Sequence, residues 1–177
     1  MTPMDRLAGI ERKRRALLDD VAALDASMLA ARPVPGKWSI REILEHLVLA
    51  EDDVVGDFSR LDQLDARTRD FGNHARYLVV MFILRFRIPV KAPSRAMLPT
   101  GARSMAELLE IWDWHHRQLR SFVAGLDRAG TRRAIFRHPI AGPLSVSQAI
   151  QMLDVHLDSH IAQIRSRIHL LRAATAG

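Results

Sequence analysis

The sequence predicts an all-α fold: a four-helix bundle forming one domain over residues 1–177, with an additional apolar helical segment between the second and third long helices. Three observations predict it. Four long stretches carry apolar residues at the helical period, each begins at a capping motif, and no long alternating pattern indicates strands. We expect helices at about residues 3–24, 39–67, 104–125 and 145–172, and the apolar segment near 72–87.

Each predicted long helix begins at a hydroxyl residue with a polar partner three residues later. This pattern is a capping box, in which the hydroxyl and its partner satisfy backbone N–H groups that the first helical turn leaves unpaired. The boxes are Ser39 with Glu42, Ser104 with Glu107, and Ser145 with Gln148, and Thr2 followed by Pro3 and Asp5 is a fourth start with proline at the first helical position. Stretches rich in proline and glycine separate the helices, and only residues 133–136 are expected to be briefly extended.

The composition is that of an ordinary globular domain. Of 177 residues, 48% are apolar and 26% are charged, which argues against disorder. The chain has no cysteine, so any metal must be held by nitrogen or oxygen. The N-terminus lacks a secretory pattern, and the apolar run at 77–84 is shorter than the roughly 20 residues of a membrane span. We expect a cytoplasmic protein without a membrane segment.

The formal charge of +6 raises the question of nucleic-acid binding. Basic residues are spread along the chain among acidic ones, and the one dense cluster, at 12–15, lies between Glu11 and Asp19 as on a solvated helix face. No helix-turn-helix, zinc-finger or RNA-binding signature accompanies it. These features argue against nucleic acid as a partner.

The segment from His74 to Leu84 is apolar nearly all round. A helix of this kind is buried, either under the bundle or against a second chain. The two alternatives are compatible, and the second predicts a homodimer.

Two histidines, His156 and His160, stand one turn apart inside the apolar stripe of the last helix. Buried imidazoles need hydrogen-bond partners or a metal, because each unpaired polar group costs roughly 1–3 kcal/mol. A pair at this spacing can bind one ion, although the spacing alone is weak evidence. The best third ligand is His46, at the edge of the apolar stripe of the second long helix. Without the glutamate of an HExxH motif, a metalloprotease is disfavoured.

Other polar residues have less defined expected roles. Asp53 lies two turns from His46 on nearly the same face, where a carboxylate could orient a ligand. His138 lies in the loop before the last helix and is a candidate for the mouth of the site. Trp38 is expected to pack rather than to contact substrate. Of the adjacent His115 and His116, at most one is expected to point inward, whereas His74 and His169 are expected at the surface.

Two stretches, KWSIREILEHLVLAED at 37–52 and HPIAGPLSVSQAIQMLDVHLDSHIAQI at 138–164, resemble the DinB/YfiT-like family of metal-dependent proteins. In that family a Trp-Ser pair opens the second long helix, a histidine follows about two turns later, and an HxxxH pair lies on the last helix. Residues 68–103 match no part of the pattern that we can name.

The resemblance implies an up-down-down-up four-helix bundle in which His46, His156 and His160 bind a divalent metal, often zinc or nickel. Members with known activity use a low-molecular-weight thiol, such as bacillithiol or mycothiol, in transferase or isomerase reactions. The first hypothesis is therefore a metal-dependent thiol transferase, or a related hydrolase or isomerase, acting on a small molecule. The alternative is a non-catalytic dimeric bundle with a structural metal or none.

Overall fold

The computed structural model describes residues 1–59, 70–88 and 94–175, and within them the chain is mostly helical. Its elements are α1 (Pro3–Ala22), α2 (Ala26–Ala30), α3 (Ile40–Ser59), α4 (Phe71–Arg85), α5 (Met105–Ala124), β1 (Ala134–His138), β2 (Gly142–Ser145) and α6 (Val146–Thr175). Two 3₁₀ turns, η2 (Arg95–Met97) and η3 (Gly130–Arg132), lie in the connections. The mostly helical content broadly fits the predicted all-α class, although a small two-stranded sheet is also present, and residues 60–67 of the predicted second helix fall outside the described residues.

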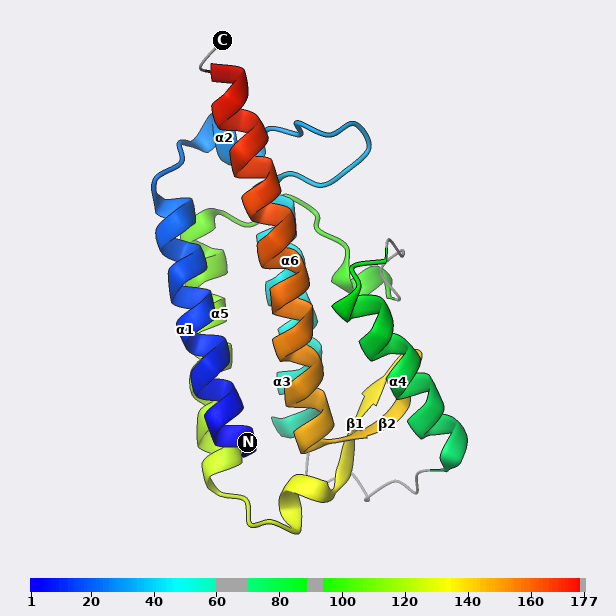
Figure 1. The fold of residues 1–177 in the computed structure, drawn as a ribbon. Coiled ribbons are helices and arrows are strands. Elements are labelled where there is room, and N and C mark those ends of the chain that lie inside the picture. Colours follow the sequence, from blue (N-terminus) through cyan, green and yellow to red (C-terminus); the bar gives the residue numbers. More distant parts are fainter. Residues whose placement is uncertain (60–69, 89–93, 176–177) are drawn as a thin grey trace.

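The long helices lie side by side along α6. This helix packs against α1, α3 and α4, and α5 packs against both α1 and α3. Figure 1 shows α1 and α5 on one side of α6, and α4 with the two strands on the other. The core between them is almost entirely aliphatic, with Trp112 as its largest fully buried side chain. No helix in the described part of the chain has the length and apolar character needed to cross a membrane.

The three predicted capping boxes are present, and the fourth predicted helix start, at Thr2, forms a capping box as well. The reciprocal bonds are of ordinary length: at α1, for example, Thr2 Oγ1 accepts from the Asp5 N–H at 3.1 Å, and Asp5 accepts from the Thr2 N–H at 2.9 Å. The same pairs of bonds join Ser39 with Glu42, Ser104 with Glu107, and Ser145 with Gln148. The caps set where the long helices begin, and thus the register of the histidines within them.

Helix α4 is less buried than its composition predicts. Its buried residues are Asn73, Tyr77 and Val80, which face the rest of the protein. The opposite face is apolar and more than half exposed, at Phe71, Leu78, Val79, Phe82 and, just beyond the helix end, Phe86. Of the two predicted alternatives, burial under the bundle accounts only for the inner face, because α4 packs against the molecule along one side only, and burial against a second chain stays a prediction for the outer face.

A β-hairpin follows α5, of which only a brief extension at residues 133–136 was expected from the sequence. Strands β1 and β2 pair antiparallel, with Phe136 opposite Leu144 and His138 opposite Gly142. The strands are only 5 and 4 residues long and the pairing is irregular between Ala134 and Phe136, so no regular alternation marks them. Gly142 has φ +75°, and a Cβ there would lie 2.5 Å from Asn73 Nδ2, so this turn requires glycine.

Candidate metal centre

Three histidines from two distant segments meet between α3 and α6. His46 lies on α3, and His156 and His160 lie one turn apart on α6. His46 and His160 are buried, whereas His156 is partly exposed. The structure thus brings together the three residues that the sequence analysis proposed as metal ligands.

Their ring nitrogens converge on one point. His156 Nε2 lies 3.0 Å from His160 Nε2 and 3.3 Å from His46 Nε2. The three potential ligand atoms all lie within 4.8 Å of one another, a spacing that could hold a metal ion. Nitrogens bound to one tetrahedral zinc ion at the usual Zn–N distance are separated by about 3.3 Å. The arrangement therefore fits a divalent ion held by three imidazoles.

The other ring nitrogens of two of these histidines have hydrogen-bond acceptors. His46 Nδ1 lies 2.7 Å from the carbonyl oxygen of Met97, and His160 Nδ1 lies 3.2 Å from Gln163 Oε1. A carbonyl oxygen can only accept, so each Nδ1 carries the proton and donates it. This tautomer leaves the lone pair of each Nε2 directed at the centre, as metal ligation requires.

Burial keeps these imidazoles neutral. It lowers the pKa of His46, against the opposing effect of the Met97 hydrogen bond, and lowers that of His160 to about 3. Burial and the nearby His160, His46 and His138 hold the pKa of His156 well below its ordinary value. Neutral imidazole is the form that binds metal, so the site requires no deprotonation near neutral pH.

Glu45 secures the loop that orients His46, a role the sequence analysis missed. Its buried carboxylate accepts from the Thr100 N–H at 3.1 Å, the Thr100 hydroxyl at 2.9 Å and the Gly101 N–H at 2.8 Å. The same loop supplies the Met97 carbonyl. Glu45 and His46, which are adjacent on α3, therefore both form hydrogen bonds with this loop. In the sequence, only the place of Glu45 among the apolar residues of this helix, next to His46, hints at this role.

Trp38 and His138 both lie close to the centre. The Trp38 ring packs against the His46 imidazole, with centroids 4.9 Å apart, as a packing residue would. His138 is buried, and its Nδ1 accepts from the Ile140 and Ala141 N–H groups at 3.2 and 3.0 Å. Burial lowers the pKa of His138 to about 4. Asp53 is exposed on α3, and its orienting role stays a prediction.

The two aspartates beside the histidine pair point elsewhere. Asp154 accepts from Arg6 at 3.0 Å and from Lys13 at 2.7 Å, and Asp158 accepts from Lys13 at 2.8 Å. Both carboxylates thus join α6 to α1.

His115 and His116 are both buried, which contradicts the prediction that at most one points inward. Helix α5 packs against two neighbours, so adjacent residues can each face a different one. His115 Nε2 lies 3.1 Å from Asp52 of α3, and His116 Nδ1 lies 3.1 Å from Glu11 of α1. His74 and His169 are exposed, as predicted.

His116 belongs to a second group of polar residues, which we call the charged cluster: Glu11, Arg14, Glu51, Asp113 and His116. Arg14 bonds both oxygens of Glu11, at 3.0 and 3.1 Å, and lies 2.6 Å from Asp113. His116 Nε2 lies 3.4 Å from Glu51 Oε2 without hydrogen-bond geometry. Burial raises the pKa of Glu11, but its bonds with Arg14 and Arg15 outweigh this and lower it to about 2.

The model of one protein family, the DinB superfamily, matches residues 10–164. The match covers most of the chain and includes all three converging histidines, so the chain belongs to the DinB superfamily. This confirms the resemblance drawn from the Trp-Ser and HxxxH motifs. Comparisons with curated proteins and with solved structures find no match.

Proposed function

We propose that this protein is a metal-dependent enzyme of the DinB superfamily, in which His46, His156 and His160 hold one divalent ion, zinc or nickel. The observation that carries the proposal is the convergence of three Nε2 atoms, with Nδ1 of His46 and of His160 donating to fixed acceptors. When bound, an ion held by three neutral imidazoles supplies a Lewis acid that lowers the pKa of a thiol or water at an open coordination position.

A thiol transferase is the activity we favour. The sequence contains no cysteine, so a thiol at this centre comes from a small molecule such as bacillithiol or mycothiol. The partial exposure of His156 supports access of such a molecule to the centre. A related hydrolase or isomerase would use the same ligands. In each case the substrate is a small molecule and the protein is cytoplasmic.

The ligands belong to a four-helix bundle in this proposal. Helices α1, α3, α5 and α6 are its members, in the up-down-down-up arrangement, and α4 is the added segment between the second and third. The packing of α6 against α1 and α3, and of α5 against α1 and α3, supports it. The whole chain, residues 1–177, is then one domain.

The metal content of the purified protein tests the proposal. We expect close to one zinc or nickel ion per chain by elemental analysis, and loss of that ion in His156→Ala. His116→Ala is the matched control, because it removes a buried histidine that is held by carboxylates rather than by other imidazoles. If metal-free protein takes up neither ion by calorimetry, or if both variants lose metal equally, the three-histidine site is wrong.

The alternative is a non-catalytic dimeric protein with a structural metal or none, and the exposed face of α4 favours a dimer. Five apolar side chains on and beside α4 are more than half exposed: Phe71, Leu78, Val79, Phe82 and Phe86. Contiguous apolar surface of this kind marks interaction sites. A second copy of the same chain would cover one such face with another.

Light scattering after size exclusion tests the dimer. We expect a dimer for the wild type and a monomer for Phe82→Glu, whereas Leu170→Glu, on the exposed side of α6, should remain dimeric. A monomeric wild type would exclude the homodimer. A dimer without any bound metal would favour the non-catalytic alternative over the enzyme.

A further inference from the structure

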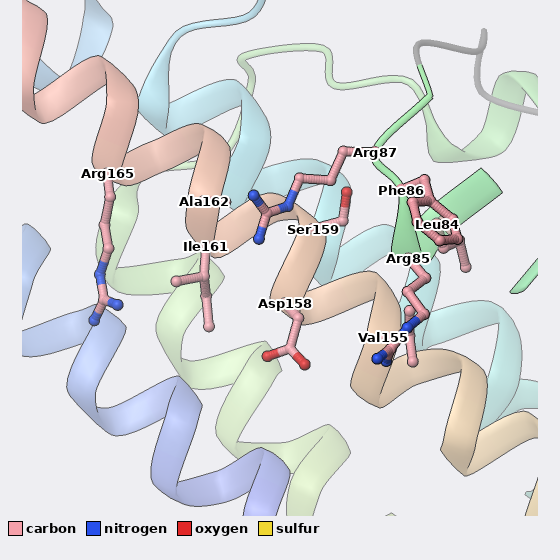
Figure 2. A pocket seen from close by; sticks show the side chains of 10 residues that line it. All are labelled: Leu84, Arg85, Phe86, Arg87, Val155, Asp158, Ser159, Ile161, Ala162 and Arg165. Carbon is pink, nitrogen blue, oxygen red and sulfur yellow. The ribbon is translucent and has the colours of Figure 1, made fainter. Parts of the chain in front are cut away.

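A pocket of about 540 Å³ lies between the C-terminal end of α4 and one face of α6. Figure 2 shows its lining, with Leu84 to Arg87 on one side and residues of α6 on the other. Val155 and Ser159 line it, each immediately before one of the two histidines of α6. The pocket thus lies on the face of α6 next to the candidate metal centre, and its volume suits a small molecule.

The pocket carries an excess of positive charge. Three arginines line it, Arg85, Arg87 and Arg165, against one carboxylate, Asp158. Asp158 is already paired with Lys13 at 2.8 Å, and Arg165 is paired with Asp20 at 3.0 Å. Neither Arg85 nor Arg87 forms an ion pair within the described part of the chain. Two guanidinium groups therefore remain available to an anion.

Arg87 occupies a backbone position that favours glycine. Its φ is +54°, the one positive value at a non-glycine residue among the described residues. It follows the end of α4, where the Arg87 N–H donates to the Leu84 carbonyl at 3.2 Å and the Ile88 N–H donates to the Ile83 carbonyl at 3.0 Å. This pair of bonds is the Schellman motif, in which glycine is usual at the position of Arg87.

The position of the Arg87 side chain gives a reason why an arginine, and not glycine, occupies this strained backbone conformation. Figure 2 shows its guanidinium extending across the pocket toward Ser159 and Ala162 of α6. The Ser159 oxygen points into the same space. Strained backbone is retained where a function requires it, and an arginine at this position places a fork of N–H donors over the pocket.

We propose that this pocket binds a small organic anion. Arg87 holds its carboxylate or phosphate group, because both groups accept paired hydrogen bonds from a guanidinium, and Arg85 adds positive charge at another part of the lining, beside Val155. The Ser159 hydroxyl adds a donor, and apolar side chains such as Phe86 and Val155 pack against the body of the molecule. The binding depends on the arginines and not on a metal at the histidines. It can therefore be tested independently of the proposed function.

Calorimetry with benzyl phosphate and phenylacetate tests the proposal, with benzyl alcohol as the uncharged control. The protein is treated with a chelator first, so that no anion can bind to a metal. We expect at least one of the two anions to bind, with an affinity that falls as salt is added, and benzyl alcohol to bind about 10-fold more weakly or not at all. Equal binding of the alcohol, or binding of neither anion, would overturn the proposal.

Arg87→Gly separates binding from folding. Glycine adopts the positive φ without strain, so this variant should melt about 2–4 °C higher than the wild type while binding the anion about 10-fold more weakly. Arg85→Ala should weaken binding similarly without removing backbone strain. Arg120→Ala, at an exposed site on α5, is the control and should bind as the wild type does. Wild-type affinity in both pocket variants would refute the anion site.

Discussion

Two buried groups in this protein contain histidine, and they differ in what surrounds the imidazoles. In the candidate metal centre, His46 and His160 donate to a carbonyl and an amide oxygen, and their free nitrogens face His156. In the charged cluster, His116 lies between Glu11 and Glu51, beside the Arg14 that pairs with Glu11. The first group keeps its lone pairs for a cation, whereas the imidazole of the second faces carboxylates on both sides. Metal binding thus depends on what the second nitrogen of each imidazole contacts.

The largest expected effect is on the charged cluster. Arg14→Met removes the buried cation that faces Glu11 and Asp113, so we expect the free energy of unfolding to fall by about 3–5 kcal/mol. Arg15→Met is the matched control: Arg15 also bonds Glu11, but its side chain is 74% exposed against 6% for Arg14. We expect a change below about 1 kcal/mol there. Urea unfolding measures both, and similar losses would show that burial does not set the difference.

The next effect is on the pH dependence of stability, which differs between the candidate metal centre and the charged cluster. The pKa of His138, beside the candidate metal centre, is lowered to about 4, so the unfolded chain takes up this proton more readily than the folded one. Its contribution to stability is complete above pH 6.5 and is lost as the pH falls toward 4, by about 3 kcal/mol at most. The pKa of Glu11 is lowered to about 2, so its contribution is present above about pH 4.5 and disappears toward pH 2.

His138→Asn tests this assignment in metal-free protein. The asparagine oxygen can accept from the Ile140 and Ala141 N–H groups in place of Nδ1, but it does not titrate. Thermal melts at pH 7 and 4.5 should show a smaller loss of stability in the variant than in the wild type. Below pH 4 both proteins should respond alike, because Glu11 is intact in both. If the variant and the wild type lose equal stability between pH 7 and 4.5, then the titration of His138 does not cause the loss.

The smallest effect concerns how firmly His46 is held. Glu45→Gln replaces one acceptor oxygen with an amide NH₂, which cannot accept from the Thr100 and Gly101 groups that Glu45 now binds. We expect the loop to hold the Met97 carbonyl less firmly and zinc affinity to fall about 10-fold. Glu110→Gln, at an exposed site on α5, is the control for the lost charge. A lower melting temperature with unchanged zinc affinity would mean that Glu45 acts on stability alone.

Local features were predicted well from the sequence. The starts of the long helices follow from caps such as Ser104 with Glu107, because capping needs only neighbouring residues and the backbone. The spacing of His156 and His160 placed both on one side of α6 for the same reason. The position of His46 at the edge of an apolar stripe made it the best candidate for the third ligand, and the family resemblance supported it, but no local rule could join it to the other two across more than 100 residues.

Features that depend on packing were missed. His115 and His116 are both buried because α5 packs against both α1 and α3. Helical periodicity shows which residues share a face of one helix, but not how many neighbours that helix has. The hairpin forms from strands too short to show alternation, and its tight turn lies against Asn73 of α4. The outer face of α4 is exposed although its residues are apolar, because hydrophobicity predicts a preference for burial and not the presence of a partner.

The sequence by itself determined the long helices, their caps and the three histidines as candidates. Only the tertiary structure decided that Nδ1 of His46 meets the Met97 carbonyl, that Glu45 holds the same loop, and that Arg87 extends over a pocket beside α6. The physical reason is the distance along the chain over which each kind of interaction acts. Caps and helical periodicity act over a few residues, whereas the direction of a lone pair and the charge of a pocket depend on groups that meet only when distant helices pack.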